Sequence, residues 1–360
     1  MAPRILLVHP GPDFSVADVF NGWKYGLERQ GAVVATYNTN DRLSFYSQAQ
    51  LRDWDHKIKC QACDQYRYKT ALDGEQAMLL TMQGLSHAVW TFMPDVMVFI
   101  SAFYTTAGMF ELMRLRGRKV VLIHTESPYQ DGEQYLRGQF ADLNLINDPM
   151  NLDEWGTLEA PAHYIPHAYH PLMHYPQPAG EVHEDPSDFA FVGTAFPSRI
   201  KFLERMDFTD VEVALGGSAW DTLEPESPLR KYLSHDPSHC VENAETARVY
   251  RGSRAGINLY RREGEQHNDY EGWAMGPREV EMAACGLPFL RDPRAESDKL
   301  FPFLPTFTTP EDATEKLRWL LADEDRRVGL GNQAREAIAD RNFDVHGQWL
   351  MQEMDDLGFF

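Results

Sequence analysis

Arg278, Glu279 and Glu281 are three charged residues that directly follow Pro277. Proline is favoured at the first position of a helix, so these side chains fall in a first helical turn, where free backbone N–H groups and the helix dipole favour an anion. A guanidinium there can fork onto phosphate oxygens, and a carboxylate can accept hydrogen bonds from the two hydroxyl groups of a ribose. The residue types and their spacing predict a site for a ligand that carries phosphate and ribose.

The surrounding residues predict the elements that position this site. Residues 256–260 form a short apolar strand, a polar loop leads to the helix, and a second strand at 288–290 follows Gly286. Glycine is common just past the end of a helix. The stretch is therefore a strand–loop–helix–strand unit of an α/β sheet.

The run REVEMAACGLPFL resembles the donor-site segment of retaining nucleotide-sugar glycosyltransferases with the GT-B fold. It is most similar to the spore-maturation-type branch, also called "glycosyl transferases group 1", of bacteria and some of their phages. In that branch an arginine precedes the glutamate by three residues, as Arg278 precedes Glu281. The resemblance implies that Arg278 contacts phosphate and Glu281 contacts ribose.

The wider superfamily carries two glutamates seven residues apart, and the second stands five residues before a glycine. Counting back from Gly286 places the second glutamate at Glu281 and the first at Trp273, which is not an acid. Glu271 and Glu279 have the spacing but lie two residues out of register. We expect Glu281 to bind the ribose, with Glu279 and Glu271 as alternatives.

Composition predicts an ordered globular protein with two hydrophobic cores, because 360 residues with 43% hydrophobic side chains exceed what one core needs. The net charge of −20, from 54 acidic and 34 basic residues, argues against free duplex nucleic acid as a partner. No run approaches the roughly 18 apolar residues of a membrane span, and the N-terminus reads as a strand, not as a signal peptide. We expect a cytoplasmic enzyme, in the host cytoplasm if a phage encodes the chain.

Two clusters could supply metal ligands, and we expect neither to do so. Cys60 and Cys63 form a C-x-x-C with His56 upstream, but no second pair stands near to complete four ligands. The run HYIPHAYHPLMHYP holds four histidines, yet its prolines favour an extended hinge. No Asp-x-Asp sequence reads as a metal-binding motif, so we expect a reaction that requires neither metal nor another cofactor.

The first half predicts a doubly wound α/β domain in which strands alternate with amphipathic helices. The strands are expected over residues 5–8, 33–37, 95–101, 119–124 and 143–147. The last of these is expected to close the sheet, and residues 44–90 are expected to be mostly helical. No G-x-G-x-x-G fingerprint follows the first strand, which argues against a nicotinamide cofactor.

Polar residues at the ends of these strands are candidates for a ligand crevice. In the resembling enzymes a histidine at a strand end comparable to that of His124 approaches the donor sugar, although His124 can also simply cap its strand. The same alternative holds for His9. The acceptor-side candidates are His9, Gly11, Asp13, Glu126 and Tyr129.

The second half begins after the Pro-rich and acidic run 175–187 with a strand at 189–192. In the resembling family a basic residue beyond the Val-Gly loop after this strand contacts the diphosphate, which matches Arg199. Residues 292–298 are expected to form another strand-end loop. The further donor-binding candidates are Gly193, Thr194, Lys201, Gly217, Tyr260 and Glu279.

The resemblance implies a GT-B fold, an α/β architecture of two Rossmann-like doubly wound domains that face a cleft. We expect the acceptor domain over 1–175, a linker over 176–187, the nucleotide-sugar donor domain over 188–342, and a C-terminal helix over 343–360 that crosses back to the first domain.

The interpretation of the whole chain is a retaining, metal-independent glycosyltransferase that moves a sugar from a nucleotide-sugar, a UDP-sugar by family resemblance, to an acceptor hydroxyl. Arg199, Arg278 and helix N-termini would stabilise the leaving diphosphate, while His124 assists at the sugar. The acceptor stays open among a glycan, a protein side chain, a small molecule and a modified base. Two alternatives remain: a sugar-nucleotide epimerase on the same fold and a non-enzymatic sugar-nucleotide-binding protein.

Overall fold

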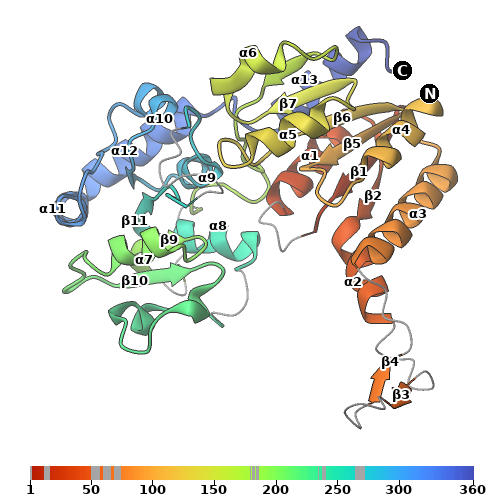
Figure 1. The fold of residues 1–360 in the computed structure, drawn as a ribbon. Helices are drawn as coiled ribbons and strands as arrows, with labels where there is room; N and C mark the ends of the chain where they lie inside the picture. The colour runs from red at the N-terminus through yellow and green to blue at the C-terminus, as the bar shows by residue number, and fades with distance from the viewer. Residues whose placement is uncertain are drawn as a thin grey trace.

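Two parallel β-sheets organise the chain, and Figure 1 shows them in separate halves of the molecule. The computed structural model describes residues 2–11, 17–49, 57–59, 66–68, 74–178, 180, 183, 186–233, 235–236, 241–263 and 272–360. The expectation of two doubly wound α/β domains is confirmed by these sheets.

The first sheet has six strands in the order β2-β1-β5-β6-β7-β8. Its strands are β1 (Arg4–His9), β2 (Val33–Asn38), β5 (Val96–Ile100), β6 (Lys119–Ile123), β7 (Leu143–Ile146) and β8 (Ala162–Tyr164). The helices of this half are α1 (Ala17–Arg29), α2 (Thr39–Ala49), α3 (Gly74–Phe92), α4 (Ala107–Leu115), α5 (Asp131–Gly138) and α6 (Leu152–Trp155), with a 3-10 turn over Pro149–Asn151.

The second sheet has four strands in the order β10-β9-β11-β12. They are β9 (Ser187–Val192), β10 (Val213–Gly216), β11 (Ser253–Asn258) and β12 (Phe289–Arg291). The accompanying helices are α7 (Pro197–Leu203), α8 (Asn243–Gly252), α9 (Pro277–Ala284), α10 (Ala295–Leu300), α11 (Pro310–Leu321) and α12 (Glu324–Ala337), with 3-10 turns over Trp220–Thr222 and Pro228–Tyr232. The last helix of the chain is α13 (Phe343–Asp356).

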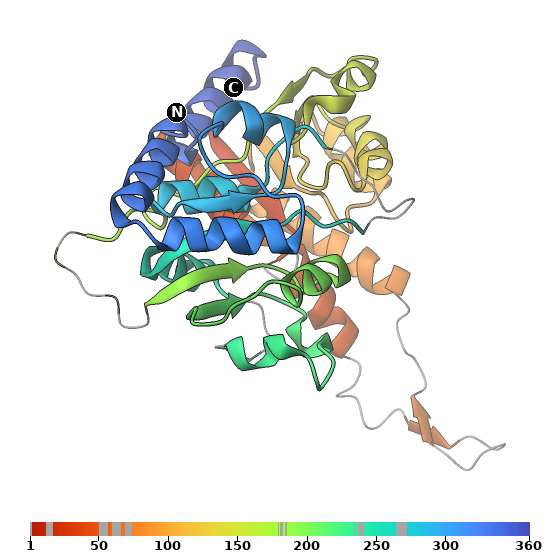
Figure 2. The same cartoon turned by 90° about the vertical axis from the view of Figure 1, so that its left-hand side faces the viewer.

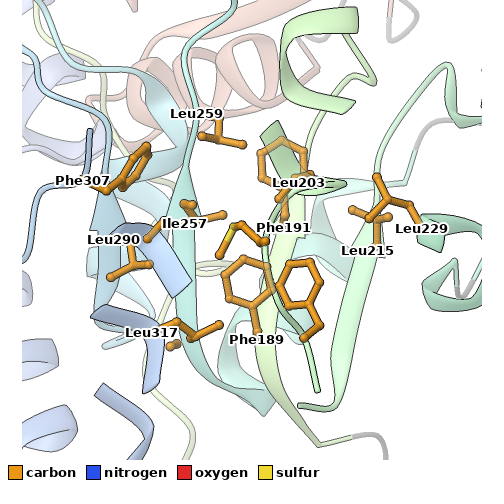
Figure 3. Packing of buried hydrophobic residues seen from close by; sticks show 14 of the residues in the cluster. Phe189, Phe191, Leu203, Leu215, Leu229, Ile257, Leu259, Leu290, Phe307 and Leu317 are labelled. Atoms are coloured by element: carbon orange, nitrogen blue, oxygen red, sulfur yellow. The ribbon is translucent and has the colours of Figure 1, made fainter. Parts of the chain in front are cut away.

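Both sheets are covered by helices on both faces, which explains why their central strands are mostly apolar and do not alternate between apolar and polar residues. In β1, Ile5 and Leu7 belong to one buried cluster while Leu6 belongs to the other. In β9, Phe189 and Phe191 likewise pack into a core with Leu203 of α7, as Figure 3 shows. The alternation of side chains along a strand thus supplies two cores from one sequence run.

Each sheet has a point at which the strand order reverses, between β1 and β5 in the first and between β9 and β11 in the second. Ligands of doubly wound folds bind outside the carboxyl ends of the strands at such points. The loops after β9 and β11 therefore define the place in the second half where a ligand is expected.

Two local expectations from the sequence were wrong, and a third region holds an element that was not expected. The first sheet is not closed at 143–147, because β8 adds a sixth strand beside β7. Residues 57–59 and 66–68 form an antiparallel hairpin, β3 (Lys57–Lys59) with β4 (Tyr66–Tyr68), inside a region expected to be mostly helical. Residues 295–300 form α10 where a loop was expected, since Glu296 and Ser297 bury their side chains and fix that turn as a helix.

Helix α13 packs against α1 and so joins the core of the first sheet, although it lies at the end of the chain. Figure 2 shows α13 in blue beside the red N-terminal part of the chain. Glycines make the approach possible, because a Cβ on Gly347 would lie 2.5 Å from the carbonyl group of Gly26. The helix backbones touch here without intervening side chains.

The chain crosses between the two halves at two places, and the crossing segments are bonded to each other. Tyr169 N donates to Arg341 O at 3.0 Å, and Phe343 N donates to Tyr169 O at 3.2 Å. We call this pair of segments, residues 169 and 341–343, the clip. Among the described helices, none is both long and apolar enough to cross a bilayer.

Replacing Gly347 by alanine is expected to lower the free energy of unfolding by about 1–3 kcal/mol, because the added methyl group must displace backbone atoms of α1. Gly329→Ala is the matched control, since Gly329 lies inside α12 with no atom within 4 Å of an added Cβ. That change should be neutral or stabilising by up to about 1 kcal/mol through helix propensity. Equal effects of the two changes in chemical denaturation would contradict the proposed contact.

Candidate functional site

Helix α9 begins at a network built around Glu279, whose side chain is fully buried. Its carboxylate accepts from Ser297 Oγ at 2.6 Å, from Gly276 N at 3.2 Å and from the hydroxyl of Tyr260. Burial raises the pKa of Glu279 to about 6. Because these oxygens are bonded inside the protein, the carboxylate of Glu279 and the hydroxyl of Tyr260 build the start of the helix.

Asp148, from the loop after β7, fixes the segment that precedes α9. Its Oδ2 accepts from Trp273 N at 2.8 Å and from Ala274 N at 2.9 Å. This contact crosses between the two halves of the molecule, and Asp148 is 4% exposed. Sequence reasoning missed Asp148, because its partners lie 125 residues away in the chain.

Glu296, on α10, continues this support. Its Oε2 accepts from Met275 N at 2.8 Å, while its Oε1 accepts from Tyr164 Oη at 2.8 Å and pairs with Arg341 at 2.7 Å. Tyr164 belongs to the first sheet, so this carboxylate also joins the two halves. Glu296 was predicted only as part of a loop.

Arg278 lies across the ends of β9 and β11. Its Nε donates to Val192 O at 2.6 Å, and its Nη1 donates to Asn258 Oδ1 at 2.9 Å. The guanidinium occupies the space where a side chain at position 193 would stand, which explains the glycine there. The sequence prediction of Gly193 and Arg278 as site residues thus corresponds to one packed unit.

Arg199 braces the same two loops from α7. Its Nε donates to Leu259 O at 2.9 Å, and its Nη1 donates to Thr194 O at 3.1 Å. Burial, and next the charge of Arg278, lower the pKa of Arg199 to about 9. Two guanidinium groups are therefore held near one another.

A third guanidinium, that of Arg261, completes a cluster that we call the arginine cluster: Arg199, Arg261 and Arg278. The first two lie 5.1 and 5.4 Å from the ring centre of Phe196, and Arg278 lies 5.2 Å from that of Phe191. Aromatic faces stabilise cations without neutralising their charge. The cluster stands at the carboxyl ends of β9 and β11, where a ligand is expected.

Arg261 was missed by the sequence analysis, although a basic residue directly after a buried strand was a usable signal. Its guanidinium lies 3.7 Å from the ring centre of Tyr129, whose hydroxyl donates to Arg261 O at 3.3 Å. Its Nε is buried and has no hydrogen-bond partner among the described residues. Tyr129, expected on the acceptor side, is thereby brought into contact with the second half of the molecule.

Glu281 and His124 line one small cavity of about 40 Å³ between the two halves. Burial raises the pKa of Glu281 to about 7, and the charge of Arg278 opposes this shift. Its carboxylate makes no hydrogen bond within the described residues. Since Glu279 and Glu281 are two positions apart on a helix, they point to different sides, and only Glu281 faces the cavity.

His124 is 1% exposed, and its Nε2 lies 3.0 Å from Asn144 Oδ1. Burial lowers the pKa of His124 to about 4, so the ring is neutral near pH 7. The other ring nitrogen, Nδ1, is buried without a partner in the described part of the chain. A neutral ring with one uncommitted nitrogen can exchange a hydrogen bond with a ligand.

Of the remaining candidates of the first half, His9 and Gly11 lie apart from the arginine cluster, and Glu126 lies beside it. His9 stacks on Phe20 at 3.7 Å and, through Nδ1, accepts from Gly11 N at 3.3 Å, so the pair shapes a turn. Burial lowers the pKa of His9 to about 4. Burial raises the pKa of Glu126, opposed first by the charge of Arg261, which places Glu126 beside the arginine cluster.

The remaining candidates of the second half contact other parts of the protein or face solvent. A Cβ on Gly217 would meet the backbone of Gly193, so this glycine permits close packing of two strand ends. Thr194 Oγ1 lies 2.9 Å from Ser218 Oγ, and Lys201 is exposed. Asp13, Glu271, His56, Cys60 and Cys63 lie outside the described residues. Within the described ranges, no three His, Cys, Asp or Glu side chains gather to hold a metal ion.

Comparison with known proteins gives a family match for most of the second half. Residues 199–348 match the family model described as "Glycosyl transferase-like". No curated protein sequence matches the chain at a significant level.

Solved structures resemble the chain over its whole length at low identity. A sucrose-phosphate synthase from Thermosynechococcus elongatus aligns with 99% of both chains at 13% identity and a TM-score of 0.61. A Listeria monocytogenes protein proposed to be a UDP-N-acetylglucosamine 2-epimerase covers 100% of this chain and 97% of its own, at 11% identity and a TM-score of 0.61.

An α,α-trehalose 6-phosphate synthase from Burkholderia multivorans covers 99% of this chain and 97% of its own, at 12% identity and a TM-score of 0.57. At such identities these likenesses establish the fold alone. Taken together, the comparisons show a GT-B fold over the whole chain and a glycosyl transferase-like match over residues 199–348.

Proposed function

We propose that the protein transfers a sugar from a nucleoside diphosphate sugar to an acceptor hydroxyl. The observation that carries this proposal is the arginine cluster at the strand ends beside Glu281, with His124 across the same cavity. Guanidinium groups on aromatic faces suit the two negative charges of a diphosphate, and an unbonded carboxylate suits ribose hydroxyls. The family match supports sugar transfer.

The chemical step is electrostatic in this proposal. As the bond between the sugar and the diphosphate breaks, negative charge grows on the leaving oxygen, and the arginine cluster stabilises that charge. His124, as a neutral ring, donates or accepts a hydrogen bond at the sugar. Retention of configuration and a uridine base are proposed on the resemblance stated above, and the acceptor is left unassigned.

Asp148 and Glu296 act indirectly. By holding the N–H groups of residues 273–275 they fix where α9 starts, and with it the positions of Arg278 and Glu281 one turn later. Misplacing such groups by about 1 Å is enough to cost on the order of 10²-fold in rate.

The first test is the release of nucleoside diphosphate from UDP-, GDP- and ADP-sugars. Arg278→Lys keeps the charge but loses the forked geometry, so turnover of the accepted donor should fall on the order of 10²-fold. Arg205→Lys, at an exposed site after α7, is the matched control. Equal turnover by wild type and Arg278→Lys would remove Arg278 from the mechanism, and a changed sugar without released nucleotide would indicate epimerisation.

Stability gives a second test, through Glu281. Its pKa is raised in the folded state, so the folded protein gains a proton that the unfolded chain lacks, and stability falls as pH rises toward about 7. Glu281→Gln removes the cost of a buried charge. At pH 8 it should raise the free energy of unfolding by about 1–3 kcal/mol. Below about pH 4 the difference should vanish, because both states are then protonated.

Nucleotide binding by Glu281→Gln should weaken under the same conditions in which the variant is more stable. Glu336→Gln, an exposed change on α12, serves as the control and should alter neither quantity. A stability gain that is the same at both pH values would show that the effect does not come from the ionisation of Glu281.

Metal removal is the third test of the proposal. Because the arginine cluster can balance the diphosphate charge, we expect turnover to persist after dialysis against EDTA. The measurement is nucleotide release before and after chelation, with Mg²⁺ and Mn²⁺ added back separately. Loss of turnover that one ion restores would contradict a metal-independent reaction.

A further inference from the structure

A second and much larger cavity, of about 710 Å³, lies within the second half of the molecule. It stands between α7, the ends of β11 and β12, and the segment before α11. Phe202, Phe307 and Thr308 form part of its wall, and Arg199, Arg262 and Arg294 contribute cations. Cavities of this size hold ligands as large as a drug-sized molecule.

Arg294 is the unusual residue in this wall. Its side chain is 7% exposed and its guanidinium lies 3.9 Å from the ring centre of Tyr260. It makes no hydrogen bond or ion pair with any described residue, and its Nε is fully buried without a partner. A buried cation is costly unless a counter-charge satisfies it.

The acidic side chains near Arg294 are bonded elsewhere. Asp292 pairs with Arg262 at 2.7 Å and accepts from Tyr260 N at 3.2 Å. Asp298 pairs with Arg291. Neither aspartate forms a hydrogen bond or an ion pair with Arg294, although the charge of Arg294 acts on Asp292.

Asp148 Oδ2 and an Arg294 nitrogen both lie close to Gly272. Asp148 is bonded to the backbone N–H groups of residues 273 and 274. Arg199, the second buried guanidinium of the wall, is bonded only to carbonyl groups. The wall of this cavity therefore holds three guanidinium groups and two aspartates, and the side chain of Arg294 makes no hydrogen bond or ion pair with any of the described residues.

We propose that this cavity binds the anionic group of a small molecule, a phosphate monoester or a carboxylate, with Arg294 as its direct contact. The anion supplies the partner that Arg294 lacks, and the apolar wall at Phe202 and Phe307 packs against the body of the ligand. Gly272, which lines the cavity, belongs to the segment leading into α9. The ligand is thereby placed next to the proposed diphosphate site, and its role in transfer rests on the proposed function, whereas the binding itself does not.

The probe is inorganic phosphate, and the readout is the thermal unfolding midpoint in saturating UDP, which keeps the diphosphate site occupied. The unfolding midpoint of the wild type should be at least about 2 °C higher in about 50 mM phosphate than in chloride of the same ionic strength without sulfate. Arg294→Gln should abolish this gain. Arg205→Gln, which removes an exposed charge from the same half, should retain it.

Arg294→Gln also separates a ligand contact from a structural role. If Arg294 serves a ligand, removing its unpaired buried charge leaves the midpoint of the ligand-free protein unchanged or raises it. A lowered midpoint together with a retained phosphate response would overturn the proposal. So would a wild-type protein that shows no phosphate response.

The proposed function can fail independently of this one. If UDP does not bind, the donor assignment fails, and the phosphate titration is repeated without UDP. Where UDP binds, the apparent affinity for an anionic ligand should fall about 10-fold to 100-fold in Arg294→Gln, because hydrogen bonds to a charged group are lost.

Turnover distinguishes the two sources of the anion. A larger rise in KM for UDP-glucuronic acid than for UDP-glucose in Arg294→Gln would place the anion on the transferred sugar. The other result would be equal KM values for both donors, together with glucose 6-phosphate that protects the wild type but not the variant against unfolding. That result would place the anion on a second ligand. An equal response of wild type and variant to all three compounds would contradict the site.

Discussion

The site depends on one run of backbone N–H groups that buried carboxylates hold. Trp273 and Ala274 donate to Asp148, Met275 donates to Glu296, and Gly276 donates to Glu279. Three acids from three separate segments thus bind four consecutive N–H groups. A hydrogen bond to a charged acceptor contributes about 1.5–3 kcal/mol, and a buried N–H left alone costs a similar amount, so the segment has one favourable arrangement.

Positive charge at the site is stabilised by aromatic rings and carbonyl groups, with few acids. Arg199 and Arg261 share the face of Phe196, and Arg278 lies near Phe191. Pairing them with carboxylates would have neutralised the charge that an anionic ligand needs. The overall excess of acids is instead carried by the remaining surface, where it leaves the strand ends free to attract anions.

The sequence predicted the parts of this protein that depend on local patterns. Strands such as β1 and β9 follow from apolar runs bounded by glycine and proline, and α9 follows from Pro277 and Gly286. The short strand β8 and helix α10 were not predicted, because their stability comes from neighbours, β7 for the first and the partners of Glu296 for the second.

The same distinction holds for the site. The spacing of Arg278 and Glu281 was readable, since both belong to one helical turn. Whether Glu279 or Glu281 faces a ligand depends on which side of α9 is buried, and that is set by Tyr260 and Ser297. Asp148 contacts its partners across the two halves, so no local sequence pattern predicts its role.

The clip between residues 169 and 341–343 has a mechanical meaning. Two connecting segments placed far apart would oppose any change in the angle between the halves. Here the crossings run side by side and are bonded to each other, so they form a single pivot. A change in the angle between the halves would bend this one joint and would also break the hydrogen bonds from Trp273 and Ala274 to Asp148, whereas sliding would break the two hydrogen bonds of the clip.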